Sequence, residues 1–215
     1  MIAIVDYGMG NLRSAQKGFE KAGCEAVVTD AVSDIASADA VVLPGVGALG
    51  DCHDGLAARG LVEPVKEAAA SGRPFLGICI GLQLLFEESE EGNASGLGIF
   101  PGRVVRFPSA AETGLKVPHM GWNEVNAVPG RACPLLEGVR PNPYAYFVHS
   151  YHALPADPAL TLATCTYGVT FPAIVGRDNV FAVQFHPEKS QTDGIAILRA
   201  FGALVRNVVC SQSGG

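Results

Sequence analysis

Gly77-Ile78-Cys79-Ile80-Gly81-Leu82-Gln83 joins an apolar run at 74–79 to a helical pattern that begins at residue 82. A Gly-x-Cys-x-Gly segment between a strand and a helix is typical of a sharp turn that holds its central side chain clear of the backbone. Such a turn also places backbone N–H groups and the positive end of a helix beside the thiol. Both features favour a thiolate and can stabilise a developing oxyanion. The stretch therefore predicts Cys79 as a candidate nucleophile.

Apolar runs alternate with helical patterns over the first ninety residues, which is typical of a parallel sheet covered by helices on both faces. We expect strands at 2–5, 25–29, 40–43 and 74–79, and helices at 14–22, 34–38, 56–70 (with a break near Pro64) and 82–88. After residue 91 the pattern indicates shorter, partly antiparallel strands at 102–107, 122–125, 144–148, 160–166, 173–176 and 181–185. A last helix is expected at 192–205 and a loose tail at 210–215.

Length and composition favour one α/β domain over residues 1–215, with an open, mostly parallel, flavodoxin-like sheet flanked by helices and an antiparallel extension. The net charge of −6, with no basic run, argues against nucleic acid or an anionic membrane as a partner. Six cysteines without paired or metal-like spacing are typical of reduced thiols in a cytoplasmic protein. No signal peptide, membrane span, metal site or organic cofactor site is expected.

A nucleophilic cysteine needs a base and a group that orients the base. Of the five histidines, only His186 comes with an acid in a rigid frame, His186-Pro187-Glu188. Residues i and i+2 of an extended segment share a face, so His186 and Glu188 can project together from the end of a strand. A lone cysteine or histidine is more often structural. The joint pattern predicts a triad in which Cys79 attacks, His186 is base and acid, and Glu188 orients His186.

Acyl transfer also requires hydrogen-bond donors for the oxyanion. The backbone N–H of Ile80, directly after the nucleophile, is one candidate. The segment Pro44-Gly45-Val46-Gly47 ends a predicted parallel strand and offers the N–H of Val46 or Gly47 as the second. Without the triad, the same segment would be an ordinary strand-to-helix turn.

The Gly-x-Cys-x-Gly-x-Gln and His-Pro-Glu motifs resemble those of the class I, triad-type glutamine amidotransferases, over essentially the whole chain. Within that family the chain is most similar to the glutaminase subunits of imidazole glycerol phosphate synthases of histidine biosynthesis. Four blocks carry this narrower resemblance: 43–47, 118–125, 146–151 and 185–190. Ile80 and Leu82 stand where leucine and methionine are more usual, which leaves the chemistry unchanged.

The resemblance implies hydrolysis of the glutamine side-chain amide to glutamate and ammonia through a glutamyl thioester on Cys79. It implies no cofactor, and it assigns the glutamine pocket to Gly47, Gln83, Glu91, Ser150 and Tyr151. From the residues alone, Gln83 and Glu91 would be exposed helix residues, and residues 150–151 a strand end.

The resemblance also implies a heterodimer with a (β/α)₈-barrel cyclase that uses the ammonia. By matching position, the residues facing it would be Asn11, Trp122, Tyr146 and Lys189. The alternatives are core packing for Trp122 and Tyr146 and a solvated charge for Lys189. The two-glycine loop further suggests a free subunit that is nearly inactive because the Gly45–Val46 peptide turns its N–H away from the oxyanion.

Three other readings remain open at this stage. The chain could serve another synthase, such as the anthranilate, guanylate or pyridoxal phosphate enzymes, although the Gly-Trp-Asn block argues against them. It could be a Cys-His peptidase on a similar fold, or a catalytically dead regulatory module. An intact Cys79, His186 and Glu188 argue against the last.

Overall fold

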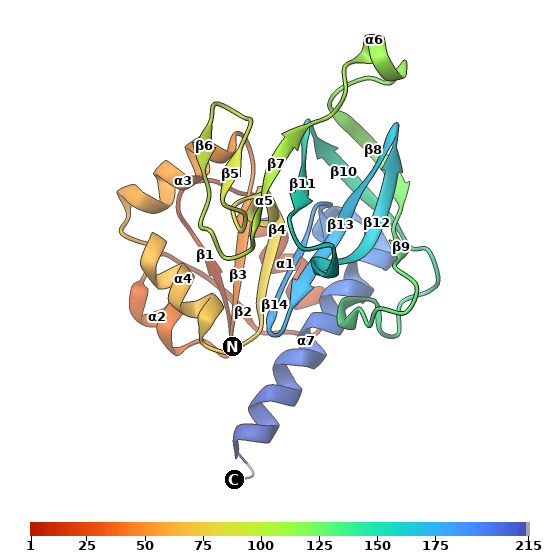
Figure 1. The fold of residues 1–215 in the computed structure, drawn as a ribbon. Helices are drawn as coiled ribbons and strands as arrows, with labels where there is room; N and C mark the ends of the chain where they lie inside the picture. Colours follow the sequence, from red (N-terminus) through yellow and green to blue (C-terminus); the bar gives the residue numbers. More distant parts are fainter. Residues whose placement is uncertain (214–215) are drawn as a thin grey trace.

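The computed structural model of the protein describes residues 1–213. Its main sheet has eight strands in the order β2-β1-β3-β4-β14-β13-β12-β9 (Figure 1). The first five are parallel: β2 (Ala26–Thr29), β1 (Ile2–Val5), β3 (Ala40–Gly45), β4 (Phe75–Cys79) and β14 (Val180–Val183). The rest are antiparallel: β13 (Val169–Arg177), β12 (Thr161–Tyr167) and β9 (Asn126–Ala127). The predicted fold class, a mostly parallel sheet with an antiparallel extension, is confirmed.

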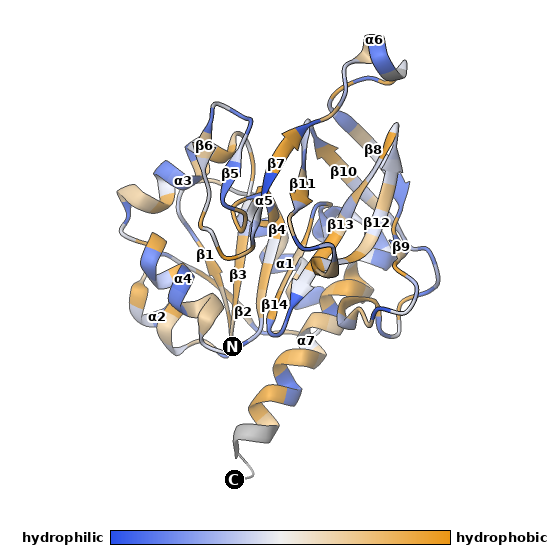
Figure 2. Cartoon of the chain, in the orientation of Figure 1, coloured by the Kyte–Doolittle hydropathy of each residue, from blue (hydrophilic) through white to orange (hydrophobic). Residues whose placement is uncertain are grey.

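The long helices form two groups. Helix α1 (Leu12–Lys21) packs against α7 (Gln191–Ser213), while α2 (Val32–Ser37) and α3 (Leu49–Ala58) both pack against α4 (Val62–Ala70). Because parallel crossovers are right-handed and β1 lies between β2 and β3, the two groups cover opposite faces of the sheet. Every residue of β1, β3, β4 and β14 is buried, and these strands are strongly hydrophobic (Figure 2). The core therefore lies along the parallel half of the sheet.

Two smaller sheets complete the fold. One pairs β10 (Tyr144–His149) with β8 (His119–Glu124), and the other has the order β11-β7-β5-β6. Its strands are β11 (Tyr151–Pro155), β7 (Gly102–Arg106), β5 (Glu88–Ser89) and β6 (Ala94–Ser95). The remaining elements are the single turns α5 (Ile80–Gln83) and α6 (Ala110–Thr113) and the 3₁₀ segments η1 (Pro134–Leu136), η2 (Pro158–Leu160) and η3 (Pro187–Lys189).

The helix predicted at 56–70 is two helices, α3 and α4, and the predicted break near Pro64 is wrong. The break lies at Arg59–Leu61, where Gly60 has a φ of 66°. Pro64 is the third residue of α4, and a first-turn residue has no intrahelical partner for its N–H. Proline is therefore tolerated there.

The helix predicted at 82–88 is also wrong, because α5 ends at Gln83. Leu84, Leu85 and Phe86 are all fully buried, whereas a helix on the surface would bury only one side. Their carbonyls accept hydrogen bonds from the N–H groups of residues 97–100 instead of continuing the helix. The chain therefore leaves the helix and packs this apolar run inward.

The last helix extends further than predicted. No glycine or proline interrupts the chain from Ala203 to Ser213, and α7 continues through that segment. The loose tail predicted at 210–215 is therefore wrong for residues 210–213, and 214–215 lie outside the described residues. Within residues 1–213, no helix has both the length and the apolar character needed to span a membrane.

Candidate active site

Cys79 lies at the carboxyl end of β4 in a conformation that L-residues rarely adopt, with φ 58° and ψ −108°. The flanking glycines make this turn possible. A Cβ at Gly81 would lie 1.8 Å from the carbonyl oxygen of Leu43, and one at Gly77 would lie 2.6 Å from the carbonyl oxygen of Gly81. The strand-to-helix turn therefore has the tight geometry that its Gly-x-Cys-x-Gly sequence indicates.

The candidate triad assembles because β14 lies beside β4, so that the segment after β14 meets the turn after β4. His186 Nδ1 is 2.8 Å from Glu188 Oε1, and these side chains are only 3% and 2% exposed. Since Nδ1 is engaged by Glu188, Nε2 is the nitrogen left for the hydrogen bond between His186 and Cys79. Burial lowers the pKa of His186, but the hydrogen bonds with Cys79 and Glu188 outweigh it and raise the pKa to about 10. The imidazole is therefore a cation at neutral pH.

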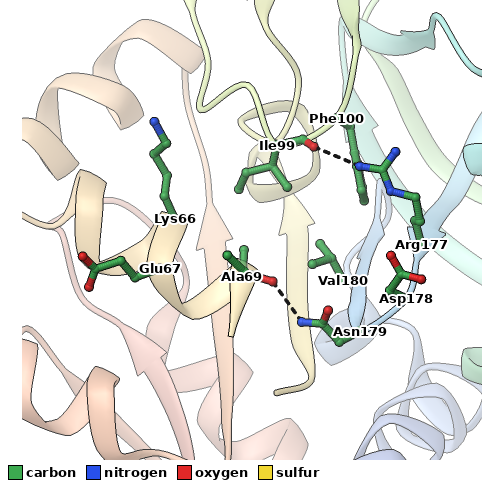
Figure 3. Close-up of a pocket in the computed structure, with 10 residues that line it drawn as sticks. Lys66, Glu67, Ala69, Ile99, Phe100, Arg177, Asp178, Asn179 and Val180 are labelled. Carbon is green, nitrogen blue, oxygen red and sulfur yellow. Dashed lines mark hydrogen bonds between the residues drawn. The ribbon is translucent and has the colours of Figure 1, made fainter. Parts of the chain in front are cut away.

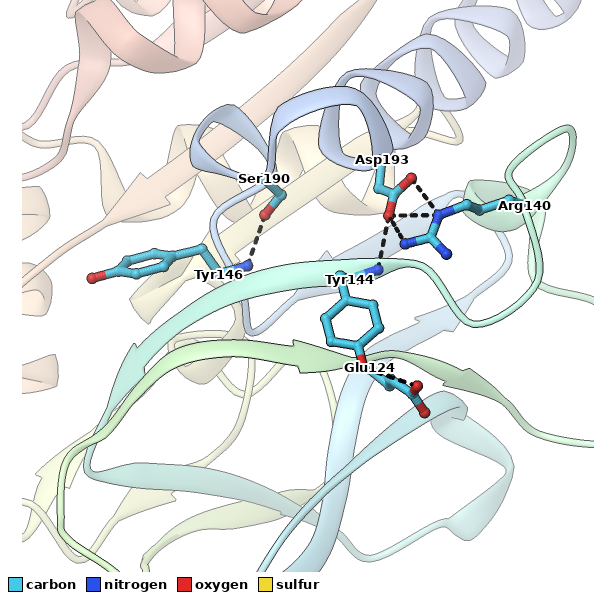
Figure 4. Close-up of polar contacts among 6 residues, drawn as sticks. All are labelled: Glu124, Arg140, Tyr144, Tyr146, Ser190 and Asp193. Atoms are coloured by element: carbon cyan, nitrogen blue, oxygen red, sulfur yellow. Dashed lines mark hydrogen bonds and ion pairs between the residues drawn. The ribbon is translucent and has the colours of Figure 1, made fainter.

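A hydrogen-bonded frame holds the backbone of His186, and Figure 4 shows the part of it that links Ser190 to Tyr146 and Asp193 to Arg140 and Tyr144. Its N–H donates to the carbonyl of Tyr146 at 2.9 Å, and Ser190 Oγ donates to its carbonyl at 2.6 Å while accepting from the N–H of Tyr146. Asp193, in the first turn of α7, accepts from Arg140 and from the N–H of Tyr144. The hydrogen bond from Arg140 holds the pKa of Asp193 below its usual range. Strand β10 is thus fastened to the start of α7, and His186 is held between them.

A cavity of about 320 Å³ opens beside Cys79. Its lining includes both predicted oxyanion segments, all five predicted pocket residues and the two reacting side chains of the triad: Val46, Gly47, Cys79, Ile80, Gln83, Glu91, Ser150, Tyr151 and His186. Glu188 is not among the lining residues and reaches the site only through its hydrogen bond with His186 Nδ1. Pro118, Val148 and His149 also line the cavity and were not predicted from the sequence.

Gln83 is buried, not exposed, and its amide is held from two sides. Its Nε2 donates to the carbonyl of Tyr151 at 3.0 Å and to Gln184 Oε1 at 3.2 Å. Gln184 is fully buried, and its Nε2 is 4.0 Å from Cys79 Sγ. The sequence reasoning missed Gln184, although a polar residue within the apolar run before His186 was a usable signal. Gln83 Oε1 is buried without a protein partner and remains an open acceptor.

Glu91 lies in a loop and reaches the start of α3, where its Oε2 accepts from the N–H of Leu49 at 2.9 Å. A carboxylate near the positive end of a helix is stabilised there. Glu91 also lines the cavity, where its carboxylate adds negative charge that suits an ammonium group.

Two buried histidines form a directed chain of hydrogen bonds that ends at the cavity. His149 Nδ1 lies 2.8 Å from the carbonyl of Tyr151 and must donate to it, so its Nε2 accepts from His119 Nδ1 at 3.1 Å. His119 Nε2 then accepts from Asn123 Nδ2 at 3.4 Å. Burial lowers the pKa of His119 to about 4 and that of His149 to about 3. Both rings are neutral at physiological pH, as this chain requires.

The residues expected to face a partner lie outside the cavity. Trp122 is 45% exposed and pairs across the strands with Tyr146, so core packing does not explain it. Met120 and Tyr144, 63% and 42% exposed, lie on the same face of the β8–β10 sheet as Trp122. Lys189 is exposed with its Nζ 6.0 Å from the Tyr146 ring centroid, and Asn11 is half-buried at the start of α1, which packs against η3.

A larger cavity of about 560 Å³ lies at the opposite edge of the sheet, near the amino ends of β4 and β14 (Figure 3). Its polar groups are engaged with the main chain: Arg177 donates to the carbonyl of Ile99, and Asn179 to that of Ala69. Its charged lining residues are Lys66 and Glu67 from α4 and Arg177 and Asp178 from the end of β13, and no cysteine, serine or histidine is among its described lining residues. The smaller cavity beside Cys79 is therefore the better candidate for the active site.

Residues 3–203 match the family model described as glutamine amidotransferase class-I, and the chain belongs to this family. It is 59% identical over 206 residues to the imidazole glycerol phosphate synthase subunit HisH of Syntrophotalea carbinolica, covering 94% of this chain and 99% of that protein. The corresponding subunit of Geobacter sulfurreducens is 52% identical over 207 residues, covering 94% and 98%.

Solved structures share the fold at much lower identity. A crystal structure of a glutamine amidotransferase superposes with a TM-score of 0.73 at 19% identity, covering 96% of this chain and all of that one. The structure of PurLQS from Thermotoga maritima gives 0.72 at 20% identity, covering 97% and 98%. These two likenesses concern the fold alone.

Proposed function

We propose that this protein is the glutaminase subunit of an imidazole glycerol phosphate synthase, in the cytoplasm, and that Cys79, His186 and Glu188 carry its reaction. The observation that carries the proposal is the triad itself, a strained Cys79 hydrogen-bonded to a His186–Glu188 pair beside a cavity lined by Gln83 and Glu91. The high identity to HisH subunits over nearly the whole chain supports the choice of synthase.

In the proposed reaction the Cys79 thiolate attacks the side-chain amide carbon of glutamine. The N–H of Ile80 and an N–H of the 46–47 segment bind the oxyanion, and the His186 cation protonates the departing ammonia. His186, now neutral, takes a proton from water, and the resulting hydroxide hydrolyses the glutamyl thioester. Glu188 keeps Nε2 of His186 directed at Cys79 throughout.

The cavity fits glutamine by charge. Glu91 would receive the α-ammonium group, and the backbone at Ser150 and Tyr151 the α-carboxylate. Gln83 supports this end of the pocket because its Nε2 holds the carbonyl of Tyr151.

The proposed partner is a (β/α)₈-barrel cyclase that consumes the ammonia. The exposed aromatic and sulfur-containing side chains on β8 and β10 would face it, together with Asn11 and Lys189. Truncation of a Trp in the centre of an interface to alanine weakens the binding free energy by about 2 kcal/mol or more. Trp122→Ala should therefore weaken cyclase binding at least ~30-fold by titration calorimetry, whereas Leu154→Ala, which removes an equally exposed side chain from β11, should not.

Ammonia release from glutamine tests the function directly. The wild-type protein with the cyclase should release ammonia and Cys79→Ala should not, while the wild type alone should be nearly inactive. Activation by another ammonia-using synthase and not by the cyclase would favour that synthase, and casein hydrolysis without glutamine hydrolysis would favour a peptidase. No ammonia under any condition would mean a dead regulatory module.

A further inference from the structure

Two buried side chains, Tyr7 and Cys52, bind the 44–47 segment at the end of β3. The Tyr7 hydroxyl donates to the carbonyl of Pro44 at 2.6 Å, and the Cys52 thiol, on α3, donates to the carbonyl of Val46 at 3.3 Å. Both side chains are fully buried and lie in contact with each other. Neither lines the cavity at Cys79. They therefore hold alternate carbonyls of the 44–47 segment on the side away from substrate.

The orientation of the second held peptide follows from its planarity. In a trans peptide the C=O and the N–H point in opposite directions. Because the carbonyl of Val46 points to Cys52, the N–H of Gly47 points away from Cys52, which does not line the cavity that Val46, Gly47 and Cys79 share. Gly47 has a φ of 88°, which lets the chain take this orientation.

Gly45 shows how closely this strand is confined. A Cβ at Gly45 would lie 2.8 Å from Tyr7 Oη and 2.8 Å from the Cβ of Ile80. There is thus no room for a side chain at Gly45, because the Tyr7 hydroxyl and the residue after the nucleophile already fill that space. Tyr7 is itself anchored, because Arg59 Nη1 donates to its carbonyl at 2.7 Å. The Gly45–Val46 peptide lies between the two held carbonyls and is held by neither side chain.

We propose that Tyr7 and Cys52 are positioning residues for glutamine hydrolysis: they hold the peptides on both sides of Gly45–Val46, and so keep the 44–47 segment where an N–H of Val46 or Gly47 can bind the oxyanion. This inference rests on the proposed function. It also limits any rotation of the strand to the Gly45–Val46 peptide, since the peptides on both sides are tied to the core. Neither Tyr7 nor Cys52 touches the substrate.

The test compares Cys52→Ala with Cys165→Ala, which removes an equally buried thiol from β12, away from the cavity. With the cyclase present, kcat for glutamine should be at least ~10-fold lower in Cys52→Ala than in Cys165→Ala. Complete loss of one oxyanion donor lowers kcat by ~10²–10³-fold, and a misplaced donor should cause part of that loss. KM should change less than about 3-fold. Cys52→Ser keeps a donor and should retain most of the activity, while Tyr7→Phe should behave like Cys52→Ala.

Alkylation of Cys79 by iodoacetamide, followed by peptide mass spectrometry, separates positioning from general damage. Displacement of iodide develops no oxyanion, so its rate should be unchanged in Cys52→Ala. Equal kcat in Cys52→Ala and Cys165→Ala would overturn the inference, and so would an alkylation rate that falls in parallel with kcat. In either case, an active wild-type complex would still uphold the proposed function. A wild-type complex that releases no ammonia would overturn both.

Discussion

Glu188→Gln isolates the contribution of the buried carboxylate to the charge of His186. The substitution keeps the size of the side chain and removes its negative charge. Glu188 Oε1 lies 2.8 Å from His186 Nδ1, with both side chains nearly inaccessible to water. Its other oxygen, Oε2, has no hydrogen-bond partner, so the variant breaks no second contact.

The magnitude follows from this one hydrogen bond. A hydrogen bond to a charged group contributes about 1.5–3 kcal/mol, and one pKa unit corresponds to about 1.36 kcal/mol. The pKa of His186, about 10 in the wild type, should therefore fall by about 1–2 units in Glu188→Gln. The hydrogen bond with Cys79 remains and keeps the pKa above the ordinary value of 6.5.

Two assays measure this shift. The imidazole proton signals of His186, followed by NMR on the isolated protein, should titrate near pH 10 in the wild type and at about pH 8–9 in the variant. Because departing ammonia needs a proton from the His186 cation, the alkaline fall of kcat with the cyclase should move by the same interval. Above pH 6.5 the unfolded state loses this proton, while the folded state keeps it until the pH nears 10. The free energy of unfolding should therefore decline as the pH rises from 6.5 to 10, and by a smaller total amount in the variant.

Glu63→Gln, an exposed carboxylate on α4, is the control and should leave both profiles unchanged. An unaltered His186 titration in Glu188→Gln would refute the reasoning, because the carboxylate would then contribute nothing to the charge of the imidazole.

Three further predictions concern the pocket and its frame. Glu91→Ala should raise KM for glutamine about 10–100-fold, from loss of a charge-assisted hydrogen bond to the α-ammonium group, in steady-state assays with the cyclase; an unchanged KM would remove Glu91 from the pocket. Gly81→Ala should destabilise the fold by about 3 kcal/mol in urea unfolding, since its Cβ would meet the carbonyl of Leu43, whereas Gly50→Ala, whose Cβ makes an ordinary contact 3.5 Å from Ala94, should cost nothing. Because His149 is neutral in the fold and gains a proton when unfolded below pH 6.5, stability should fall by about 2 kcal/mol from this residue between pH 7 and pH 5; His149→Gln should lose that part of the slope, and His53→Ala should keep it.

The sequence predicted the parallel half of the fold well because four of its five strands, β1, β3, β4 and β14, are short apolar runs that are buried throughout. β1 was predicted with its observed bounds, and the elements around Cys79 and His186 were placed in the right order. The errors fall where long-range contacts override local pattern. The run at 84–86 reads as helix, but residues 97–100 take its carbonyls, which no local pattern could reveal.

The same distinction holds for the site. The order and spacing of its reactive residues can be read from the sequence because the motifs are local, Gly-x-Cys-x-Gly and His-Pro-Glu. Gln184, His119 and His149 were missed because their roles depend on partners thirty or more residues away or on burial. Tyr7 and Cys52 contact the 44–47 segment from elements on either side of it in the sequence, and neither has a motif of its own.

Strand β8 explains why the block at 118–125 combines so many unusual residues. Successive side chains of a strand point to opposite faces. Met120 and Trp122 therefore point outward to the exposed face, while His119 and Asn123 point inward and form the hydrogen-bond chain that reaches the carbonyl of Tyr151. Gln83 binds the same carbonyl from inside the cavity. A single strand thus exposes large side chains on one face and supports the cavity beside Cys79 from the other. A partner that shifted β8 would move both histidines with it, since neither ring can rotate without breaking a buried hydrogen bond.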